Sequence, residues 1–289
     1  MPLRHIALAI IVMALWGTNF VAARIGLDVV APTLLASLRF LLAGLPLMML
    51  LPRPRVHWAL LTAYAFTAFA LQFTLVFGAL YFGMPAGLAS LVMQCQVFFT
   101  TFLAVIFLAE RPNLYQVLGA TVGGVGIAVV GLGMQQHAPL LPLLLTLGAA
   151  LSWSASNLIV RRLEAPDPIA LVVWGSGIAS LFLVPLSLWL DGVAAWRDAL
   201  EHLAAGEIKL WGAVLYNVIC ASLLGYGGWS ALLRRHPASV VAPFTLLVPI
   251  FGLSSAALLL GETVAHLTWA GAALVFVGLM VTQIRRAQD

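Results

Sequence analysis

Arg39 is the residue of this sequence with the clearest potential for chemistry. It stands seven residues into the apolar run from Pro32 to Leu51, and an arginine at a helix centre costs about 2.5–3.5 kcal/mol on membrane-insertion scales. A guanidinium group can hold a carboxylate through two parallel hydrogen bonds, so one interpretation is that Arg39 binds the carboxylate of a small solute. The other interpretation is that Arg39 caps helix carbonyls or extends to the membrane interface, about 10 Å away at helical rise.

Two pairs of an indole and an amide form the next group of candidates. Asn19 and Asn157 lie inside apolar runs, and each amide has four hydrogen-bonding sites to satisfy. Trp16 precedes Asn19 by three positions and Trp153 precedes Asn157 by four, so each pair shares one face of a helix. We expect these four side chains to line a polar cavity. Hydrogen bonds between helices, or core packing of the indoles, are the alternative.

Four further amides lie within apolar runs, and they are Gln72, Gln94, Gln96 and Asn217. Residues two apart on a helix do not share a face. We therefore expect at most one of Gln94 and Gln96 to meet a solute, and we take Gln72, Gln94 and Asn217 as candidates for the cavity.

Several kinds of chemistry have no counterpart in the sequence. No Asp or Glu falls inside an apolar run, and the six His residues lie at the ends of runs or between them. The phosphate-binding pattern GxxxxGK[ST] does not occur, which excludes ATP-driven pumping by this chain. Cys95 and Cys220 lie in apolar runs and are interpreted as small hydrophobic residues. The sequence thus predicts neither an enzyme nor a bound cofactor or metal.

The composition indicates a membrane protein. Hydrophobic residues make up 63% of the 289 residues and charged residues 8%, against about 25% charged residues in soluble domains. Runs of about 20 apolar residues reach across the hydrocarbon core of a bilayer as helices. We predict an all-α integral membrane protein with ten such helices: Ile6–Ala23, Pro32–Leu51, His57–Leu80, Pro85–Leu108, Leu114–Gly133, Pro139–Val160, Pro168–Leu190, Leu210–Leu233, Pro237–Leu260 and Leu267–Ile284.

The sequence also contains a duplication. Four residues recur 152 positions later, so that Pro85, Glu110, Gly119 and Gly126 correspond to Pro237, Glu262, Gly271 and Gly278. The duplication predicts two five-helix repeats, residues 1–137 and 138–289. Gly175, seven residues after Pro168, occupies the place of Arg39 in the second repeat. The charge is therefore confined to one repeat.

The distribution of basic residues predicts the orientation. With the N-terminus in the cytoplasm, ten arginines fall in inner connections and only Arg24, Arg197 and Lys209 in outer ones, which agrees with the positive-inside rule. Both termini are then cytoplasmic. Because five is an odd number, the second repeat enters the membrane from the opposite side, which is the inverted arrangement of many transporters.

Three local predictions concern connections and bends. Glu110 and Glu262 each precede a new helix, where a carboxylate serves as a turn and cap residue. The connection from Asp191 to Lys209 predicts a short interfacial helix with Trp196, Ala199, Leu200 and Leu203 on one side. Gly225, Gly227 and Gly228, and Pro249, are interpreted as bending points, or the glycines as sites of close helix contact.

The chain resembles the EamA family of the drug/metabolite transporter superfamily. The resemblance rests on WGTNF at 16–20, SLRFLLAG at 37–44, GMPAGLASLV at 83–92 and LLVPIFGLSSAALLLGE at 246–262. Within that family the chain is similar to bacterial exporters of amino-acid metabolites such as cysteine and O-acetylserine. The resemblance implies a helical bundle with a central cavity, a multi-pass inner-membrane location and outward movement of small metabolites.

Other functions are weighed against this one. An exporter of drugs or other apolar metabolites suits the aromatic content of 10% but leaves Arg39 unexplained. A membrane-embedded lipid-modifying enzyme needs clustered His, Asp or Glu at one membrane face, whereas the acidic residues here are scattered. The expected partners are a small-molecule substrate and membrane lipids, without nucleic acid, and the sequence does not fix an oligomeric state.

Overall fold

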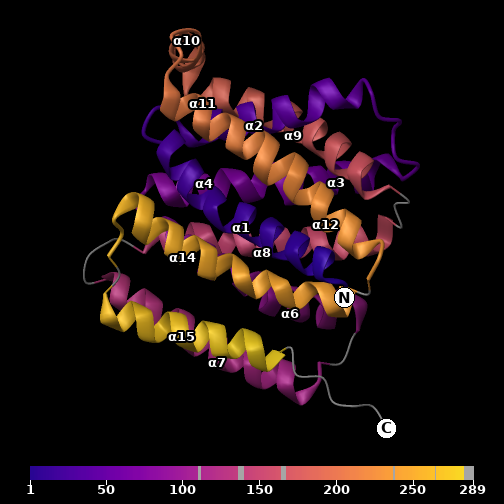
Figure 1. The fold of residues 1–289 in the computed structure, drawn as a ribbon, viewed down its shortest axis with the longest axis vertical. Helices are drawn as coiled ribbons and strands as arrows, with labels where there is room; N and C mark the ends of the chain where they lie inside the picture. The colour runs from indigo at the N-terminus through magenta and orange to yellow at the C-terminus, as the bar shows by residue number, and fades with distance from the viewer. Residues whose placement is uncertain (110–111, 136–139, 164–166, 237, 264, 283–289) are drawn as a thin grey trace.

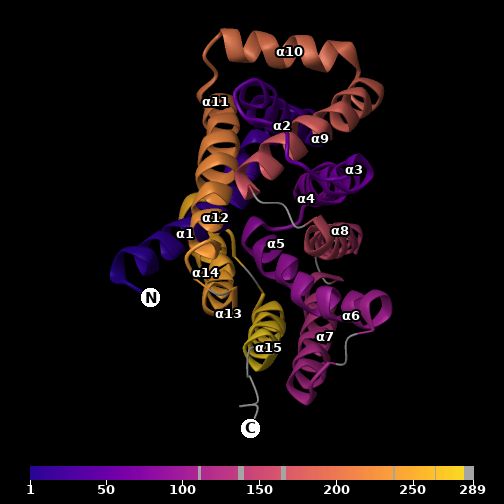
Figure 2. The ribbon, with the colours of Figure 1, turned by 90° about the vertical axis from the view of Figure 1, so that its right-hand side faces the viewer.

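The computed structural model describes residues 1–109, 112–135, 140–163, 167–236, 238–263 and 265–282, and these residues form helices and no strand. The helices are stacked in layers along the long axis of the molecule (Figure 1). At one end of this axis α7 (Leu114–Gln135) packs against α15 (His266–Thr282). At the other end α10 (Gly192–Ala204) crosses over α11 (Ile208–Leu215), α2 (Pro32–Met48) and α9 (Pro168–Leu190), as Figure 2 shows.

The predicted all-helical membrane class agrees with the helix lengths. Six helical segments of the described residues are long and apolar enough to cross a membrane: Leu3–Gly26, Trp58–Tyr81, Ala86–Phe107, Leu141–Leu163, Pro168–Leu190 and Ile208–Leu233. Four shorter apolar helices accompany them: Pro32–Met48, Leu114–Val130, Phe244–Leu260 and His266–Thr282. The first and fourth of the long segments comprise α1 (Leu3–Gly26) and α8 (Leu141–Leu163).

Four of the predicted spans are not continuous α-helices. The π-helical segment η1 (Phe66–Leu71) separates α3 (Trp58–Ala65) from α4 (Gln72–Tyr81). The π-helical segment η3 (Tyr216–Gly225) separates α11 from α12 (Tyr226–Leu233). The 3₁₀ segment η2 (Met93–Cys95) lies between α5 (Ala86–Val92) and α6 (Gln96–Leu108). The 3₁₀ segment η4 (Ala242–Leu246) lies between α13 (Ala238–Val241) and α14 (Leu247–Leu260). The apolar pattern alone does not reveal such interruptions.

Two of the predicted bending points differ in kind. The π-helical segment η3 ends at Gly225, so the eighth span is irregular where its glycines predict weakness. Pro249 is the third residue of α14 and directly follows the 3₁₀ segment η4, which contains Thr245, the residue whose carbonyl a backbone N–H at position 249 would bond in an α-helix. The ninth span is thus irregular just before Pro249, and a bend at this proline stays a prediction.

The helix ends follow from specific residues. Pro32 and Pro168 are the first residues of α2 and α9, and the Asp167 carboxylate accepts hydrogen bonds from the N–H groups of Ile169 and Ala170. Asn113 and Gln116 exchange two hydrogen bonds of 2.9 Å as a capping box at the start of α7. Helices α6 and α14 both end in a left-handed residue, Ala109 (φ 52°) and Gly261 (φ 64°).

The glycines of α7 and α15 allow these two helices to touch. A Cβ atom added to Gly119 would lie 2.6 Å from the carbonyl oxygen of Gly278, and one added to Gly126 would lie 2.8 Å from that of Gly271. The early residue of α7 thus meets the late residue of α15, so the two helices run antiparallel. Gly119 thus lies at a close contact between two helices, and Gly123 packs on the ring of Phe98.

The first helix of each predicted repeat packs largely on the other repeat. Helix α1 packs against α14, η3 and α11, whereas α8 packs against α4 and α6. At the same time α2 contacts α9, where an added Cβ at Gly44 would lie 2.2 Å from the backbone nitrogen of Gly177. The two groups of helices are therefore interleaved rather than separate globules.

Glu262 is a cap residue, but not of the helix predicted. Its carboxylate accepts hydrogen bonds from the N–H of Ala86 (2.7 Å) and of Gly87 (3.1 Å), at the start of α5. The sequence prediction placed it at the start of the following helix, because that helix is its neighbour along the chain. Glu110 and the predicted repeat boundary at 137–138 lie outside the described residues.

The predicted helix between Asp191 and Lys209 is confirmed as α10. Ala199 is buried, and the Trp196 Nε1–H donates a 3.0 Å hydrogen bond to Ser187 Oγ. Leu200 is 57% exposed, so the apolar side of α10 is only partly covered by the rest of the protein. The carboxylate of Asp191 accepts hydrogen bonds from Ser187 and Thr33, which ties α10 to the ends of α9 and α2.

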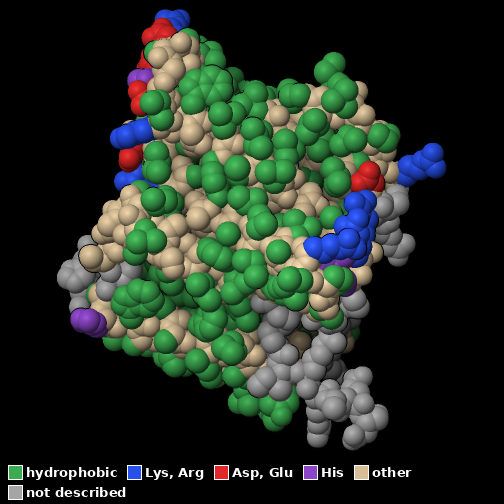
Figure 3. All heavy atoms as spheres, viewed as in Figure 1, with side chains coloured by type: hydrophobic (Ala, Val, Ile, Leu, Met, Phe, Trp, Pro, Cys, Tyr) green, Lys and Arg blue, Asp and Glu red, His purple; other side chains and the backbone are tan. Residues whose placement is uncertain are grey.

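The surface view agrees with a membrane environment. Figure 3 shows a broad hydrophobic surface in the middle, a cluster of basic side chains on one side and a charged edge along α10 on the other. Large apolar side chains are exposed on this protein, among them Leu181, Trp189 and Leu258. In a bilayer such side chains contact lipid, so their exposure costs nothing.

Candidate functional site

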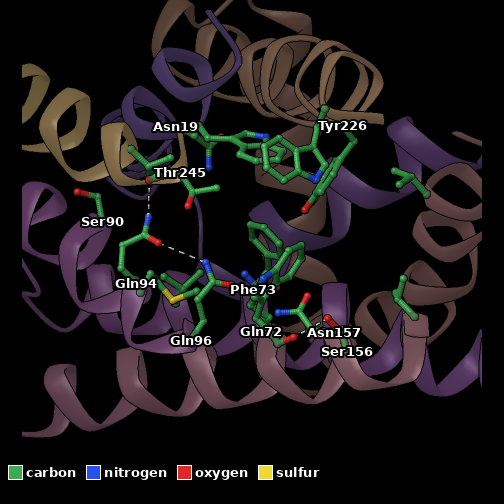
Figure 4. Close-up of a pocket in the computed structure, with 18 of the residues that line it drawn as sticks. Asn19, Gln72, Phe73, Ser90, Gln94, Gln96, Ser156, Asn157, Tyr226 and Thr245 are labelled. Atoms are coloured by element: carbon green, nitrogen blue, oxygen red, sulfur yellow. Dashed lines mark hydrogen bonds between the residues drawn. The ribbon is translucent and has the colours of Figure 1, made fainter. Parts of the chain in front are cut away.

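A central cavity of about 410 Å³ lies between the helices, with residues from both predicted repeats in its wall. Figure 4 shows Asn19 and Thr245 on one side, Gln72 and Asn157 on the opposite side, and the Tyr226 ring at a third position. Arg39 is the one charged residue among the described residues that line it. Seven of the eight sequence candidates line this cavity: Trp16, Asn19, Arg39, Gln72, Gln94, Trp153 and Asn157.

The cavity extends toward one end of the helix bundle. Its wall includes Val160 near the end of α8, Pro168 at the start of α9 and Leu233 at the end of α12. At the opposite end α5 and α14 are in close contact, since a Cβ added to Gly87 would lie 3.0 Å from Cα of Leu253. The Glu262 carboxylate joins the same two helices there. The wall of the cavity thus reaches one end of the bundle, whereas α5 and α14 are in contact at the other end.

Arg39 is fully enclosed and held by neutral groups. Its side chain is 2% exposed. Nη1 donates a 2.7 Å hydrogen bond to Asn217 Oδ1, and Nε donates a 3.1 Å hydrogen bond to Ser222 Oγ. Neither capping of helix carbonyls nor extension to the membrane interface describes this geometry, because both partners are side chains of η3 in the interior.

Aromatic rings complete the surroundings of the guanidinium group. Its central carbon lies 4.2 Å from the ring centroid of Phe73 and 5.2 Å from that of Phe40, within the range of cation–π contacts. Among the described residues no carboxylate pairs with Arg39, and no acceptor is bonded to Nη2. A buried cation without a counter-ion carries a desolvation penalty of several kcal/mol, so this site favours an anionic occupant.

Asn217 has a different role from the one predicted. It is completely buried and is not part of the cavity wall. Its Nδ2 donates a 2.9 Å hydrogen bond to the carbonyl oxygen of Ala213, which turns Oδ1 toward Arg39. Asn217 is therefore a positioning residue for the guanidinium group. Both its oxygen and its nitrogen are thus bonded inside the protein.

Ser222 is a candidate site residue that the sequence analysis missed. It lies five residues after Asn217, and its Oγ–H donates a 2.8 Å hydrogen bond to the Asn217 carbonyl oxygen. In an α-helix, residues five apart point in different directions, so only the π-helical segment brings the two beside Arg39. Phe73 was missed as well, because a phenylalanine in an apolar run carries no sign of facing a cation.

Asn19 and Gln72 present acceptors that have no partner. Each side chain is 7% exposed, and Asn19 Oδ1 and Gln72 Oε1 are buried without a hydrogen bond. An unsatisfied buried acceptor costs roughly 1–3 kcal/mol. Asn157 differs, since its Nδ2 donates a 3.2 Å hydrogen bond to Thr100 Oγ1. Asn157 thus lines the cavity and also links two helices.

Gln94 and Gln96 both line the cavity, so the premise that they cannot share a face does not hold, and the number of them that meet a solute stays a prediction. Gln96 Nε2 lies 3.5 Å from Gln94 Oε1, and Gln94 Nε2 donates a 3.2 Å hydrogen bond to the Thr245 carbonyl oxygen, as Figure 4 shows. The 3₁₀ segment η2 separates α5 from α6 at this point, so the even spacing of an α-helix does not apply.

The indoles and Tyr226 form an aromatic wall. The Tyr226 ring lies 5.4 Å from Trp16 and 6.4 Å from Trp153, and Trp229 lies 5.6 Å from Trp16. Trp16 Nε1–H donates a 3.1 Å hydrogen bond to the carbonyl oxygen of Ala221 in η3. An added Cβ at Gly225 would lie 2.4 Å from that nitrogen, so the glycine lets the indole approach.

No group of three or more His, Cys, Asp or Glu side chains gathers among the described residues. Cys95 is buried and Cys220 is partly buried, and both are free. The described cavity wall offers a solute one cation, neutral amides and aromatic rings.

Comparisons with known proteins agree with one another. The family model of EamA-like transporters matches residues 3–132 and again residues 140–284. A protein of Salmonella typhimurium named probable amino-acid metabolite efflux pump is 40% identical over 280 residues, covering 95% of this chain and 93% of that protein. Its namesake in Escherichia coli is 38% identical with the same coverage.

Two more distant matches extend the comparison. A protein of Streptantibioticus cattleyicolor named probable terminal-alkyne amino-acid exporter is 25% identical over 288 residues, covering 96% of this chain and 92% of that protein. One solved crystal structure superposes with a TM-score of 0.63 at 16% identity, covering 96% of this chain and 95% of the other. At that identity the structural match shows the fold alone.

Proposed function

Because the chain belongs to the EamA-like transporter family, we propose that it exports amino acids or their derivatives, such as cysteine and O-acetylserine, by alternating access. The single observation that carries this proposal is Arg39, an enclosed guanidinium group in the cavity wall without a carboxylate partner among the described residues. The α-carboxylate of an amino acid supplies the missing anion. The names of the bacterial relatives point to the same class of substrate.

Size and polarity support a small zwitterion as the occupant. Ligand pockets of about 300–1,000 Å³ hold molecules of drug size, so a cavity of about 410 Å³ has room for an amino acid with its water. The aromatic wall formed by Trp16, Trp153 and Tyr226 suits an aliphatic or thiol side chain. A bidentate guanidinium–carboxylate pair fixes orientation as well as affinity.

We further propose that residues 1–137 and 138–289 are inverted repeats of five membrane-spanning helices each. The repeated match of the family model supports this division, as does the antiparallel contact of Gly119 with Gly278 and of Gly126 with Gly271. Gly119 corresponds to Gly271 in the duplication but contacts Gly278, and Gly126 corresponds to Gly278 but contacts Gly271. A two-fold axis in the membrane plane relates the two helices in this way.

The position of the cavity supports alternating access. The end that the cavity wall reaches adjoins Arg161 and Arg162 in the last turn of α8 and Arg234 and Arg235 after α12. With basic connections in the cytoplasm, we infer that the cavity opens inward and that both termini are cytoplasmic in the inner membrane of a bacterium. The contact of Glu262 with α5 then closes the outer end, and export requires that contact to break.

The competing function within transporters is export of drugs or other apolar compounds, which the aromatic wall favours. A cationic drug, however, meets Arg39 as a like charge, and no Asp or Glu is among the described lining residues. A lipid-modifying enzyme needs clustered acid–base side chains, and the described lining residues contain none of these. The amino-acid proposal therefore explains more of the cavity.

Counterflow in proteoliposomes tests the proposal. The panel contains cysteine, O-acetylserine, other amino acids and cationic dyes, each with and without a pH gradient. We expect Arg39→Gln to lower amino-acid counterflow at least about tenfold, because a lost charge-assisted bond is worth roughly 1.5–3 kcal/mol. The matched control is Arg24→Gln, which removes an arginine from the exposed pair with Asp28 and leaves counterflow unchanged. Unchanged amino-acid counterflow in a normally expressed Arg39→Gln protein contradicts the proposal, and so does a wild-type protein that moves dyes but no amino acid.

A further inference from the structure

Two histidines meet outside the cavity, where α1 begins and α12 ends. His5 Nδ1 and His236 Nε2 lie 2.7 Å apart and share a hydrogen bond, and the two ring centroids lie 4.9 Å apart in an edge-to-face arrangement. Neither residue lines the cavity, and carboxylate binding gives neither of them a role. Figure 1 shows the start of α1 close to the end of α12. The hydrogen bond therefore joins the first helix of one predicted repeat to a helix of the other.

The histidine pair is the last in a row of contacts between α1 and the chain from Gly225 to His236. The contacts follow one another by about one turn on each side: Trp16 with Gly225, Val12 with Gly228, Ala9 with Leu232, and His5 with His236. Positions fall along α1 as they rise along α12, so the two helices run antiparallel. We call this row the α1–α12 seam. Its outermost contact is the histidine pair, at the end where Arg234 and Arg235 follow α12.

A hydrogen bond between two imidazoles limits the number of protons that they can carry. A neutral imidazole has one N–H donor and one acceptor nitrogen, whereas an imidazolium ion has two donors and no acceptor. The pair therefore exists with both rings neutral or with one ring protonated. A second proton removes the acceptor and places two positive charges side by side. The observed geometry is thus compatible with at most one extra proton on the pair.

The charged groups around the pair do not balance a second proton. Those that act on His5 are His236, Arg4, Arg235 and the amino terminus, and all of them are positive or become positive on protonation. The other elements around this end of α1 are α12, α13 and η4, which contain no charged residue. Among the described residues the one ion pair is that of Arg24 with Asp28. Coulomb repulsion therefore adds to the loss of the hydrogen bond when both rings are protonated.

We propose that His5 and His236 form a pH-dependent clamp, which holds the α1–α12 seam closed while the pair carries at most one extra proton and releases it when both imidazoles are protonated. Imidazole is the side chain whose charge ordinarily changes between about pH 5 and 8. The contribution of the clamp is therefore present at neutral and basic pH and is lost as the pH falls. With basic connections in the cytoplasm, the clamp responds to the pH of the cytoplasm.

Release of the clamp acts on the cavity through the helices that it joins. Asn19 of α1 and Tyr226 and Leu233 of α12 line the cavity, so both sides of the seam belong to its wall. Leu233 stands three residues before His236, at the end of the bundle that the wall reaches. Separation of α1 from α12 at the histidine pair widens this end first. Acidification thus changes access to the cavity without protonating any residue of its wall, and it does so whichever solute the cavity binds.

Thiol labelling of the purified protein in detergent measures the opening of the seam. Cys95 and Cys220 are replaced by alanine, and Ala9→Cys places one thiol at a position that is 0% exposed, one turn inside His5. The labelling rate at each pH is divided by the rate for the same variant unfolded at that pH, because the thiol itself titrates. We expect this ratio to rise about tenfold between about pH 7.5 and about pH 5, a factor in the range expected for the loss of one hydrogen bond.

Variants of the histidines show whether the pair is the group that responds. The double variant His5→Gln/His236→Gln keeps two side chains that form hydrogen bonds but take up no proton. Its labelling ratio should change less than about twofold over the same pH range, because the proton linkage is gone. The matched control His202→Gln replaces an exposed histidine of α10 and should keep the full response. If Ala9→Cys does not fold, Leu232→Cys, which is 1% exposed on the other side of the seam, replaces it.

Two results overturn the clamp. One is a labelling ratio that stays at its neutral value in acid while both histidines are present. The other is an acid response of equal size in His5→Gln/His236→Gln, which assigns the opening to another titrating group. Both results leave amino-acid export untouched, because the labelling experiment contains no solute.

Discussion

The surroundings of Arg39 and of Gly175 differ sharply, although both residues stand seven positions after the proline that begins their helix. Around Arg39, the segment η3 contributes Asn217 and Ser222 as hydrogen-bond acceptors. Around Gly175, the segment η1 and the helix before it contribute Phe69 and Tyr64, whose ring atoms lie 2.8 and 3.0 Å from where a Cβ atom would be. One place is a polar socket for a cation, and the other is filled by aromatic rings.

The backbone is nevertheless alike at both places. Both sites face a π-helical segment, η3 in one case and η1 in the other. The residues 152 positions before Asn217 and Ser222 are Ala65 and Ala70, which offer no polar atom. The two places therefore share a π-helical neighbour and differ in their side chains, and only the surroundings of Arg39 offer polar partners.

The largest expected effect in this comparison comes from Asn217→Ala. This substitution removes a hydrogen-bond acceptor of Arg39, so the surroundings of Arg39 become more like those of Gly175. Removing the 2.7 Å bond to a charged group costs roughly 1.5–3 kcal/mol, equivalent to about a tenfold to hundredfold loss of amino-acid affinity. We expect KM in proteoliposome transport to rise by that factor while the protein remains folded. An unchanged KM means that Arg39 keeps its orientation without η3, and the polar socket then has no function.

Gly175→Ala tests the aromatic side of the comparison. The new methyl group collides with the rings of Phe69 and Tyr64, and overpacking of this kind costs typically about 1–3 kcal/mol. The thermal unfolding temperature of the detergent-solubilised protein should fall accordingly. Gly212→Ala is a suitable control, because an added Cβ there has no neighbour within 4 Å. Equal unfolding temperatures for the two variants contradict a filled site at Gly175.

The smallest expected effect concerns the two residues at which α6 and α14 end. They differ in type but share one backbone conformation. Ala109 and Gly261, 152 positions apart, both adopt left-handed conformations, with φ of 52° and 64°. Only glycine adopts this conformation without steric cost, which is about 1–2 kcal/mol for other residues. Ala109→Gly should therefore raise the free energy of unfolding by about 1 kcal/mol, and Gly261→Ala should lower it similarly. Opposite signs in a denaturation series contradict the shared geometry.

Much of the fold is predictable from the sequence, because the free energy of transferring apolar side chains from water into a membrane depends on the composition of each helix separately. Apolar run lengths and prolines such as Pro32 and Pro168 locate helices within a few residues. The π-helical and 3₁₀ segments are not predictable in this way, since their hydrogen bonds shift register without a change in composition. The assignment of Asn217 to the cavity failed for that reason, as did the premise that Gln94 and Gln96 cannot share a face.

The sequence by itself determined that this protein enters a membrane, that its helices occur in a duplicated order and that Arg39 lies deep in an apolar run. These properties depend on composition and spacing, which each segment carries alone. Only the tertiary structure decided which polar groups find partners. Asn217 and Ser222 satisfy Arg39 from another helix, whereas Asn19 and Gln72 keep unpaired oxygens. A hydrogen bond between helices depends on their mutual rotation and distance, and neither quantity is encoded in a single span.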